Sequence, residues 1–458
     1  MDATAFSLWA ASTYGVYRLT SLPVSAVYAA TAYFAYHYIP NLLGFEPVAA
    51  KDAVWAIERD NNRMVIVSIG VFEHTSAQSM KSLLREKAFY GQKRARQYIR
   101  RIYGRTYWVE DEKFSFEDHF HVISTPVRSK AELCALASDL ASRVFPANRP
   151  FWDFFFVSHY SADRSAVIFK FHHVLMDGLS AVSAITHCAD ANSSDVFYKL
   201  PKANWIKRLF ASAVAVVVLP YWLWAWGELK DDQNPLHGAA LSGGKSVFWT
   251  EPLSLAAIKS YCRLHSISLN DFLAAATLRT LRKCTQSTQD HTRFSLFLPI
   301  SLRGLPEDGS ALPLDNDFAS LLLHMPAADS PDLEQECSKL FSSVKNSTEP
   351  MALALSTYLL GLLPMEAAGK MIFSVSDRAT LVFSNVPGPR AGLKFGGAAL
   401  EQLIAVAPAS GTCGISVTTL SYQDKLTIAC YTDKALLSEA KLMADCLSEE
   451  IEMSLRIG

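Results

Sequence analysis

Two long uncharged apolar runs are the feature that most limits how this chain of 458 residues can fold. The first run, Leu19 to Phe45, is long enough to cross a hydrocarbon layer of ~30 Å as a helix. The second run, Leu209 to Gly227, ends in tyrosine and tryptophan, which favour a membrane interface. The runs divide the chain into an apolar membrane-associating segment (1–46), a first half (47–195), a hydrophobic connector (196–244) and a second half (245–458).

The position of the second run restricts its topology. It lies between two halves that, as argued below, must build one site, and a full span would put them on opposite sides of a membrane. We therefore predict an interfacial or re-entrant connector, with the basic flank Lys202, Lys207 and Arg208 on lipid headgroups. Only the N-terminal run can span. The alternative for both runs, which Pro23 and Pro220 interrupt, is a buried helix of a soluble core.

Charge and cysteine usage exclude several classes of function. The formal net charge of -1 provides no field that would gather nucleic acid. The eight cysteines contain no C-x-x-C pair and no histidine at metal-ligand spacing, so we expect reduced, buried thiols and no metal. The N-terminus lacks the basic region of a cleaved secretory signal. Together with the two apolar runs, these features predict a membrane-associated protein that faces the cytosol, at the endoplasmic reticulum or a lipid droplet.

Both halves show a mixed α/β pattern. The spacing of apolar residues predicts a helix at Leu269–Cys284, capped by Asn270 or Asp271, and a closing helix at Leu436–Leu455. A hairpin is expected through Tyr422–Asp424. The remaining predicted helices are Ala77–Phe89 and Lys130–Arg143, and the predicted strands are Met64–Phe72, Ala166–Phe171, Phe294–Ile300, Ser320–Met325, Ala379–Val386, Gly414–Ser421 and Lys425–Tyr431.

Two adjacent histidines stand where an apolar strand ends. His172 and His173 point to opposite faces of that strand, so only one of them can face a cleft. A neutral imidazole can take the proton of a hydroxyl group as its oxygen attacks a carbonyl. Asp177 can cap the following helix, and Gly178 gives the backbone room to turn. On this pattern alone, structural histidines are as good an interpretation as a catalytic one.

The segment His172-His173-x-x-x-Asp177-Gly178 resembles the HHxxxDG motif of the wax ester synthase/diacylglycerol acyltransferase family. Peptide-synthetase condensation domains carry the same string, so other segments must decide. Further blocks follow in the order of that family over roughly residues 51 to 433. They are Pro150-Phe151-Trp152 (P-L-W, with Phe151 for Leu), Leu269–Ala274 (N-D-x-x-L-A), Leu298–Arg303 (P-x-S-L-R), Ser384–Pro389 (S-N-V-P-G-P) and Gly414–Tyr422.

The resemblance implies an α/β fold of two lobes, similar to chloramphenicol acetyltransferase and other coenzyme A-dependent acyltransferases, with a tunnel between them. It implies that His173 is the general base, that Asp177 is a structural carboxylate and that His172 supports them. Acyl-CoA would enter one mouth as co-substrate, with no permanently bound cofactor, and a long-chain alcohol or diacylglycerol would enter the other. Phe151 puts the family's acceptor-size preference in doubt, because it is larger than leucine.

The remaining candidates support the reaction. Asn270, Ser416 and Thr418 are candidate donors to the oxyanion. The alternatives are that Asn270 is a helix cap and that the two hydroxyls belong to ordinary strand residues. Gly178, Trp152 and Asn385 are candidates for the substrate wall, with packing as the alternative for Trp152. Three residues are given structural roles: Arg303, which would pair with Asp177 between the lobes, and Pro387 and Gly388, which would stiffen a loop along the tunnel.

The predicted function is O-acyl transfer from acyl-CoA to a long-chain fatty alcohol, and to diacylglycerol, without a covalent acyl-enzyme. Two alternatives remain open at this point. A peptide-type condensation enzyme would need carrier domains and would have no use for membrane segments. A catalytically silent lipid-binding protein of the same fold would not need the intact His173 and Asp177.

Overall fold

The computed structural model describes residues 44–89, 91–102, 104–161, 163–190, 205–228, 232, 234–285, 293–303 and 311–457, with isolated positions 24, 27, 31 and 42. The first apolar run therefore lies almost wholly outside the described residues, and its role as a membrane span stays a prediction. In the part of the chain that is described, no helix has both the length and the apolar character of a membrane span.

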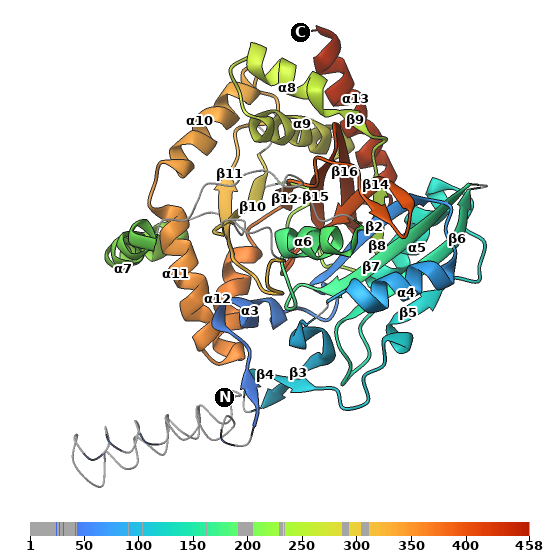
Figure 1. The fold of residues 1–458 in the computed structure, drawn as a ribbon. Coiled ribbons are helices and arrows are strands. Elements are labelled where there is room, and N and C mark those ends of the chain that lie inside the picture. The colour runs from blue at the N-terminus through green and yellow to red at the C-terminus, as the bar shows by residue number, and fades with distance from the viewer. Residues whose placement is uncertain are drawn as a thin grey trace.

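The first lobe is built on a six-stranded mixed sheet (Figure 1). Continuous burial of the two central strands, β2 (Val65–Glu73) and β7 (Arg164–His172), explains their runs of apolar residues. Helices α4 (Ala77–Lys87), α5 (Lys130–Ser142) and α6 (Gly178–Cys188) accompany the sheet. In spatial order its strands are β13 (Lys394–Phe395), β14 (Ala398–Val406), β2 (Val65–Glu73), β7 (Arg164–His172), β6 (Trp152–Ser161) and β5 (Phe120–Val122).

The second lobe is built on a seven-stranded mixed sheet. Its core strands β12 (Leu381–Val386) and β15 (Ile415–Tyr422) run parallel. β15 and β16 (Lys425–Asp433) form the predicted hairpin, with Gln423 at a positive φ of 56° in the turn. In order along the sheet, the strands are β11 (Phe318–His324), β10 (Ser295–Ser301), β12 (Leu381–Val386), β15 (Ile415–Tyr422), β16 (Lys425–Asp433) and β8 (Lys245–Trp249), with β9 (Leu253–Ser254) beside β16.

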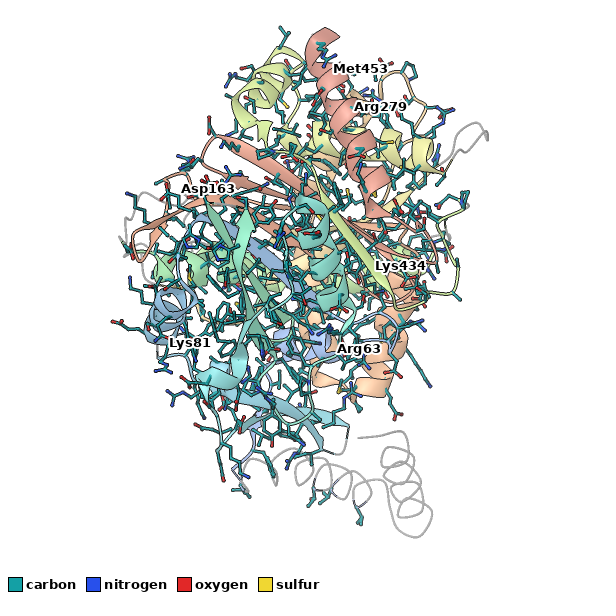
Figure 2. All side chains as sticks on the ribbon, turned by 90° about the vertical axis from the view of Figure 1, so that its right-hand side faces the viewer. Arg63, Lys81, Asp163, Arg279, Lys434 and Met453 are labelled. Carbon is teal, nitrogen blue, oxygen red and sulfur yellow. The ribbon has the colours of Figure 1, made fainter. Side chains whose placement is uncertain are left out.

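Helices cover this second sheet at one end of the molecule. Arg279 of α9 (Leu269–Cys284) and Met453 of α13 (Ala440–Ile457) lie near each other at the top of Figure 2, above Asp163 and Lys81 of the first lobe. α8 (Leu255–Leu264) and α10 (Leu333–Lys345) pack against α9. A third, three-stranded sheet joins β1 (Glu46–Pro47), β4 (Arg105–Glu110) and β3 (Gln97–Ile102).

Most predicted elements are confirmed within a few residues, and α9 has the predicted bounds. The predicted cap of α9 is wrong: the Ser268 hydroxyl caps it by accepting the Asp271 amide hydrogen, and the Asp271 carboxylate accepts the Ser268 amide hydrogen. The closing helix starts at Ala440, after a turn in which the amides of Leu436 and Leu437 donate to the Asp433 carbonyl. All eight cysteines are free, but Cys284 and Cys446 are only partly buried, contrary to prediction.

The sequence boundary between the lobes is crossed in space. β14 belongs to the second half of the chain, yet it pairs with β2 of the first lobe from Leu400 to Val406. The lobes are also joined by a buried ammonium group, since the Lys245 Nζ donates to Asp433 at 3.0 Å and to Asn62 at 3.0 Å. The two lobes therefore fold against each other as one unit, as a site between them requires.

The hydrophobic connector forms α7 (Trp205–Gly227), which contains Pro220. It packs along α11 (Glu349–Leu362) at the edge of the molecule (Figure 1), and α12 (Met365–Ser376) follows α11. Val217 and Trp224 of α7 are 79% and 61% exposed. The alternative of a fully buried core helix is therefore wrong for this run.

Candidate active site

The junction between β7 and α6 carries the two histidines and the carboxylate. β7 ends at His172, and α6 begins at Gly178 with Asp177 as its N-cap, whose carboxylate accepts the Ser180 amide hydrogen at 2.9 Å. The His173 amide donates to the Met64 carbonyl at 2.8 Å, which continues the pairing with the first-lobe strand beside it. The capping role predicted for Asp177 is confirmed.

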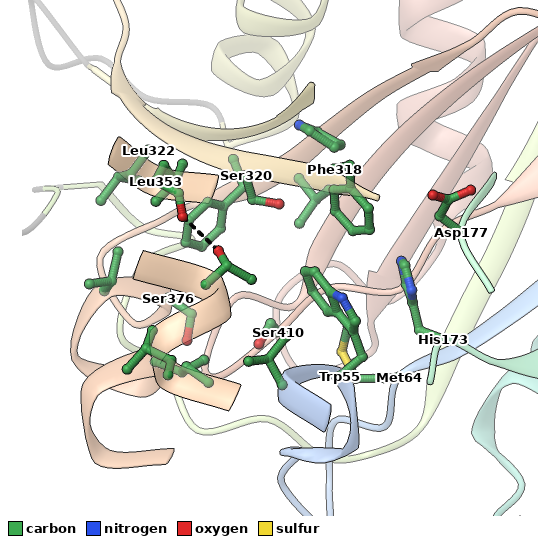
Figure 3. Close-up of a pocket in the computed structure, with 18 of the residues that line it drawn as sticks. Trp55, Met64, His173, Asp177, Phe318, Ser320, Leu322, Leu353, Ser376 and Ser410 are labelled. Carbon is green, nitrogen blue, oxygen red and sulfur yellow. Dashed lines mark hydrogen bonds between the residues drawn. The ribbon is translucent and has the colours of Figure 1, made fainter. Parts of the chain in front are cut away.

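His173 faces a cavity and is held by aromatic rings. Its imidazole stacks on the Trp55 indole at 4.7 Å between ring centroids, and the Trp55 indole stacks in turn on Phe318 at 4.7 Å. Figure 3 shows these rings between His173 and the aliphatic side chains of Leu322 and Leu353. Such contacts fix the plane of the imidazole, each at about 0.5–1.5 kcal/mol beyond area burial.

An amide side chain fixes the tautomer of His173. The His173 Nδ1 and the Asn316 Oδ1 are 2.9 Å apart. The Asn316 Nδ2 donates at 3.0 Å both to the buried Asp52 carboxylate and to the His173 carbonyl, so the amide oxygen must face the imidazole. His173 therefore donates from Nδ1, and its Nε2 keeps the lone pair that a general base needs.

Burial sets the protonation state of His173. Enclosure by apolar groups lowers the pKa of the imidazole to about 4, because desolvation disfavours the charged form more than Asp177 and Asn316 favour it. The residue is partly exposed, and it lines the cavity. His173 is therefore neutral at pH 7, in the form that accepts a proton.

His172 points to the opposite side of the strand. Its Nε2 lies 3.0 Å from the Glu58 carboxylate, and its Nδ1 accepts the Val174 amide hydrogen at 3.1 Å. Burial opposes ionisation of Glu58, yet contacts with His172, Met64 and Arg63 hold the pKa of that carboxyl at about 2. His172 lies outside the cavity wall and anchors the loop from behind.

The expected pairing of Arg303 with Asp177 is confirmed. The Arg303 Nη2 donates to Asp177 at 2.6 Å, and both side chains are under 10% exposed. The second-lobe segment after residue 311 is tied to the same carboxylate, since the Asp317 amide donates to Asp177 at 3.0 Å. Asp177 and Arg303 thus hold the loop that carries Asn316, which in turn orients His173.

Breaking this clamp should misplace Asn316. We expect Asp177→Asn and Arg303→Ala each to lower kcat by ~10- to 100-fold, because displacement of a positioning group by about 1 Å has that effect. The double variant should lose little more than either single variant, since both changes release the same loop. Steady-state kinetics of the four proteins measure this, and additive losses in free energy would show that the two residues act separately.

A large apolar cavity lies in front of His173 and extends between the lobes. Its volume is about 800 Å³, sufficient for long aliphatic chains. One end meets His173, Asp177 and Gly178, and the wall continues along β10, β11 and β12 to α7, α11 and α12. Leu219, Leu223, Leu353, Leu360, Leu363 and Met371 are among the apolar residues of that wall.

The other predicted residues divide into wall and support. Gly178, Asn385, Pro387 and Thr418 line the cavity. The residues that lie outside it are Trp152, Phe151, Ser416, Asn270 and Gly388. The buried Trp152 indole donates to the Ala95 carbonyl, and Phe151 packs against the His172 ring. The Ser416 hydroxyl donates to the Ala407 carbonyl, the Asn270 amide oxygen accepts from Asn385, and Gly388 packs on Ser421. The packing alternative for Trp152 is thus the correct one.

Three residues of the site were missed by the sequence reasoning: Asn316, Trp55 and Phe318. Asn316 stands in the segment Leu314-Asp315-Asn316-Asp317, whose acidic residues are typical of an exposed turn. One feature of the sequence could have identified Asn316: its polar segment leads directly into the apolar strand β11, and polar residues at the end of a strand can lie at the edge of a sheet, where sites form. Trp55 and Phe318 resemble ordinary core residues, and only the fold brings them to the imidazole.

The low pKa of His173 predicts an unusual pH dependence. A histidine with an ordinary pKa near 6.5 would lose base activity below that pH. We expect kcat/KM to stay level from pH 8 to pH 5.5, because the free enzyme keeps His173 neutral until the pH approaches 4. Initial rates at low substrate concentration test this, and an acidic limb centred near pH 6.5 would contradict it.

Folding stability limits the range of that experiment. The unfolded chain protonates this histidine near pH 6.5 and the folded chain only near pH 4. The contribution of His173 to the free energy of unfolding is therefore complete above pH 6.5 and is lost as the pH falls toward 4. Far-UV circular dichroism at each pH separates unfolding from loss of the base.

Comparison with known proteins identifies a family whose models match both lobes of this chain. Residues 50–208 match the model of the wax ester synthase/diacylglycerol acyltransferase catalytic domain, and residues 314–454 match that of the WS/DGAT C-terminal domain. The O-acyltransferase WSD of Acinetobacter baylyi is 23% identical over 387 residues, 76% of this chain and 82% of that protein. A Mycobacterium tuberculosis protein, named as a probable diacylglycerol O-acyltransferase, tgs1, is 23% identical over 374 residues, 75% of this chain and 80% of its own length.

Solved structures show the same fold. The wax ester synthase/diacylglycerol acyltransferase of Marinobacter aquaeolei VT8 superposes with a TM-score of 0.63 at 19% identity, covering 90% of this chain and 99% of that one. The starter condensation domain of rhizomide synthetase, in complex with C8-CoA, superposes with a TM-score of 0.60 at 14% identity, covering 92% and 96%. The two-lobed acyltransferase fold is therefore confirmed. With both of its lobes matched by the family's own models, this chain belongs to the wax ester synthase/diacylglycerol acyltransferase family and is an acyltransferase.

Proposed function

We propose that the enzyme transfers a fatty acyl group from acyl-CoA to a long-chain alcohol, and also to diacylglycerol, with His173 as the general base. The observation that supports this most is a neutral histidine whose Nε2 is free, at the end of an apolar cavity of about 800 Å³. A cavity of that character suits aliphatic chains on both substrates. The name of the Marinobacter protein covers both acceptors, and that of the Mycobacterium tuberculosis protein names diacylglycerol.

The chemistry follows from the orientation of the imidazole. The acceptor hydroxyl donates its hydrogen bond to the His173 Nε2, and its oxygen attacks the thioester carbonyl carbon as the proton passes to His173. The resulting tetrahedral intermediate carries the negative charge on the former carbonyl oxygen. Cleavage of its carbon–sulfur bond releases CoA, whose sulfur takes the proton from His173, so that the base is regenerated without an acyl-enzyme.

Donors for the oxyanion must come from the cavity wall. Of the predicted candidates, Thr418 lies on that wall, and Asn385 joins it. The Asn385 Nδ2 donates to Asn270 at 2.6 Å, and its Oδ1 accepts from Thr419 at 2.7 Å, so its amide is rigidly held. We assign oxyanion stabilisation to these two wall residues, with Asn270 as the residue that orients Asn385, and Ser416 has no part in this scheme.

Products distinguish the possible acceptors. Purified protein is incubated with labelled palmitoyl-CoA and either hexadecanol or diacylglycerol, and the lipids are resolved. Formation of palmityl palmitate or triacylglycerol supports the proposal and gives the acceptor preference. If label stays in palmitoyl-CoA with every alcohol offered, the proposed donor or acceptor class is wrong.

We further place the enzyme at the surface of a membrane or lipid droplet, on the cytosolic side. α7 and α11 carry large apolar side chains toward solvent, next to the apolar cavity. Patches of this kind mark contact with lipid or protein. The exposed residues on these two helices are Val216, Val217, Tyr221, Leu223, Trp224, Met351, Tyr358, Leu359 and Leu362.

Charges on this patch should release the protein from lipid. We expect Val217→Glu with Trp224→Glu to weaken binding to phosphatidylcholine vesicles at least ~10-fold, because two apolar side chains lose their burial. Val144→Glu with Leu442→Glu, at positions that are 60% and 52% exposed outside α7 and α11, is the matched control. Co-sedimentation measures both pairs. Equal losses in the two pairs would refute a specific lipid contact at α7.

A further inference from the structure

A second, basic cleft lies beside the hairpin of β15 and β16. It has a volume of about 620 Å³ and is separate from the apolar cavity. Three cationic side chains line it: Lys259 and Arg263 of α8, and Arg390 from the loop after β12. Asp424 also lines the cleft, so its lining carries three cationic side chains and one carboxylate, a composition that suits an anion.

The arrangement of these cations is set by the fold. Lys259 and Arg263 are four residues apart on α8 and therefore project on one face. The start of α8 is bound to the hairpin, because the Leu255 amide donates to the Asp424 carbonyl at 2.9 Å and β9 pairs with β16. Lys259 and Arg263 are therefore held in a fixed position relative to the hairpin, and Arg390 lines the same cleft.

Arg390 is placed by a loop with little freedom. The Gln423 amide donates to the Pro389 carbonyl at 2.8 Å, and the Gly388 amide donates to the Ser421 hydroxyl at 3.2 Å. A Cβ at position 388 would overlap the Ser421 carbonyl oxygen, so only glycine permits this approach. The loop that carries Arg390 is therefore fixed against the β15–β16 hairpin.

The same loop connects the cleft with the reaction chamber. Asn385 and Pro387 line the apolar cavity, and Arg390, three residues later, lines the basic cleft. Three residues span at most ~11 Å of extended chain. A ligand with an anionic head and an extended arm can thus have its head in the cleft while its arm follows the loop to the cavity.

We propose that this cleft binds the phosphates of the acyl-CoA nucleotide, with Lys259, Arg263 and Arg390 as the phosphate-binding residues. This assignment rests on the proposed function, in which the donor is a CoA thioester. With this assignment the two substrates enter separately. The nucleotide of CoA binds beside α8 and the β15–β16 hairpin, and the lipophilic acceptor enters the cavity from the side of α7 and α11.

Truncated donors test the assignment. We expect the variant Lys259→Gln/Arg263→Gln/Arg390→Gln to raise KM for palmitoyl-CoA by ~10-fold or more, because several exposed charge contacts to phosphate are lost together. Its KM for palmitoyl-pantetheine, which has no nucleotide, should equal that of the wild type. The wild-type KM for palmitoyl-CoA should also rise with salt, and the variant should be nearly insensitive to it.

A matched control removes three cations elsewhere. Lys113, Arg128 and Lys339 are exposed and lie outside the cleft, and their replacement by glutamine should leave both KM values unchanged. Equal KM increases for both donors, or none for either, would overturn the assignment. The third contradicting outcome is an unchanged KM with lost binding to phosphatidylserine vesicles, since the cleft would then bind lipid headgroups.

CoA binding measured by calorimetry, without turnover, separates this inference from the proposed function. If CoA binds the wild type and binds the triple variant at least ~10-fold more weakly, the cleft is supported even if no alcohol is acylated. If alcohols are acylated and the variant binds CoA like the wild type, the proposed function stands and the cleft assignment falls.

Discussion

Replacement of His173 by alanine is expected to lower acyl transfer at least ~100-fold, because the reaction loses its general base. The fold should survive, since His173 contributes one stacked ring and one hydrogen bond at the edge of a cavity. Turnover with palmitoyl-CoA and hexadecanol measures the effect, and circular dichroism monitors the fold. A variant that kept more than a tenth of the wild-type rate would show that another group is the base.

His172→Ala provides the comparison for this result. His172 contacts Glu58 and the Val174 amide and lies outside the cavity wall, so its loss should affect stability more than chemistry. The variant leaves the buried Val174 amide without its acceptor, which costs about 1–3 kcal/mol for an unsatisfied polar group, whereas Glu58 keeps Met64 and Arg63 as partners. The two variants should therefore separate loss of turnover from loss of stability.

Asn316→Leu is expected to produce the second-largest loss, ~100-fold in kcat with little change in KM. Leucine has a similar size but cannot accept the Nδ1 hydrogen, so His173 samples the tautomer that presents no base to the cavity. The buried Asp52 carboxylate also loses its partner amide. Wild-type turnover in this variant would remove the positioning role of Asn316.

A pH profile distinguishes positioning from general damage. In Asn316→Asp, a carboxylate beside Nδ1 still accepts the hydrogen and favours the imidazolium, so the acidic limb of kcat/KM should move up from about pH 4. A residue with only a structural role would lower the profile without shifting it. An unshifted limb in the aspartate variant would therefore contradict the proposed contact.

Local sequence patterns predict the positions of helices and strands in this fold better than they predict which strands pair or which residue caps a helix. α9 was recognisable because apolar residues recur at helical spacing from Leu269 to Cys284. Its cap was assigned wrongly, although Ser268 and Asp271 have the spacing of a capping box. The pairing of β14 with β2 was not predictable in this way, because β-strand periodicity identifies a strand without identifying its neighbour.

The same limit applies to the site. The His-His-x-x-x-Asp-Gly segment is continuous in sequence, so the proposed base and the capping carboxylate are recognisable without the structure. Asn316 is 143 residues from His173, and it reaches the imidazole only because Arg303 and Asp177 tie the two lobes together. Contacts of this kind depend on tertiary folding, and motif spacing carries no information about them.

We propose that the acyl group passes directly from acyl-CoA to the alcohol, with a neutral His173 as the base and without an acyl-enzyme. Rapid-quench measurement of CoA release over a single turnover tests it most directly. We expect no CoA burst when palmitoyl-CoA is mixed with the enzyme alone, and equal amounts of CoA and palmityl ester once hexadecanol is present. A burst of CoA equal to the enzyme concentration before any alcohol is added would contradict the claim.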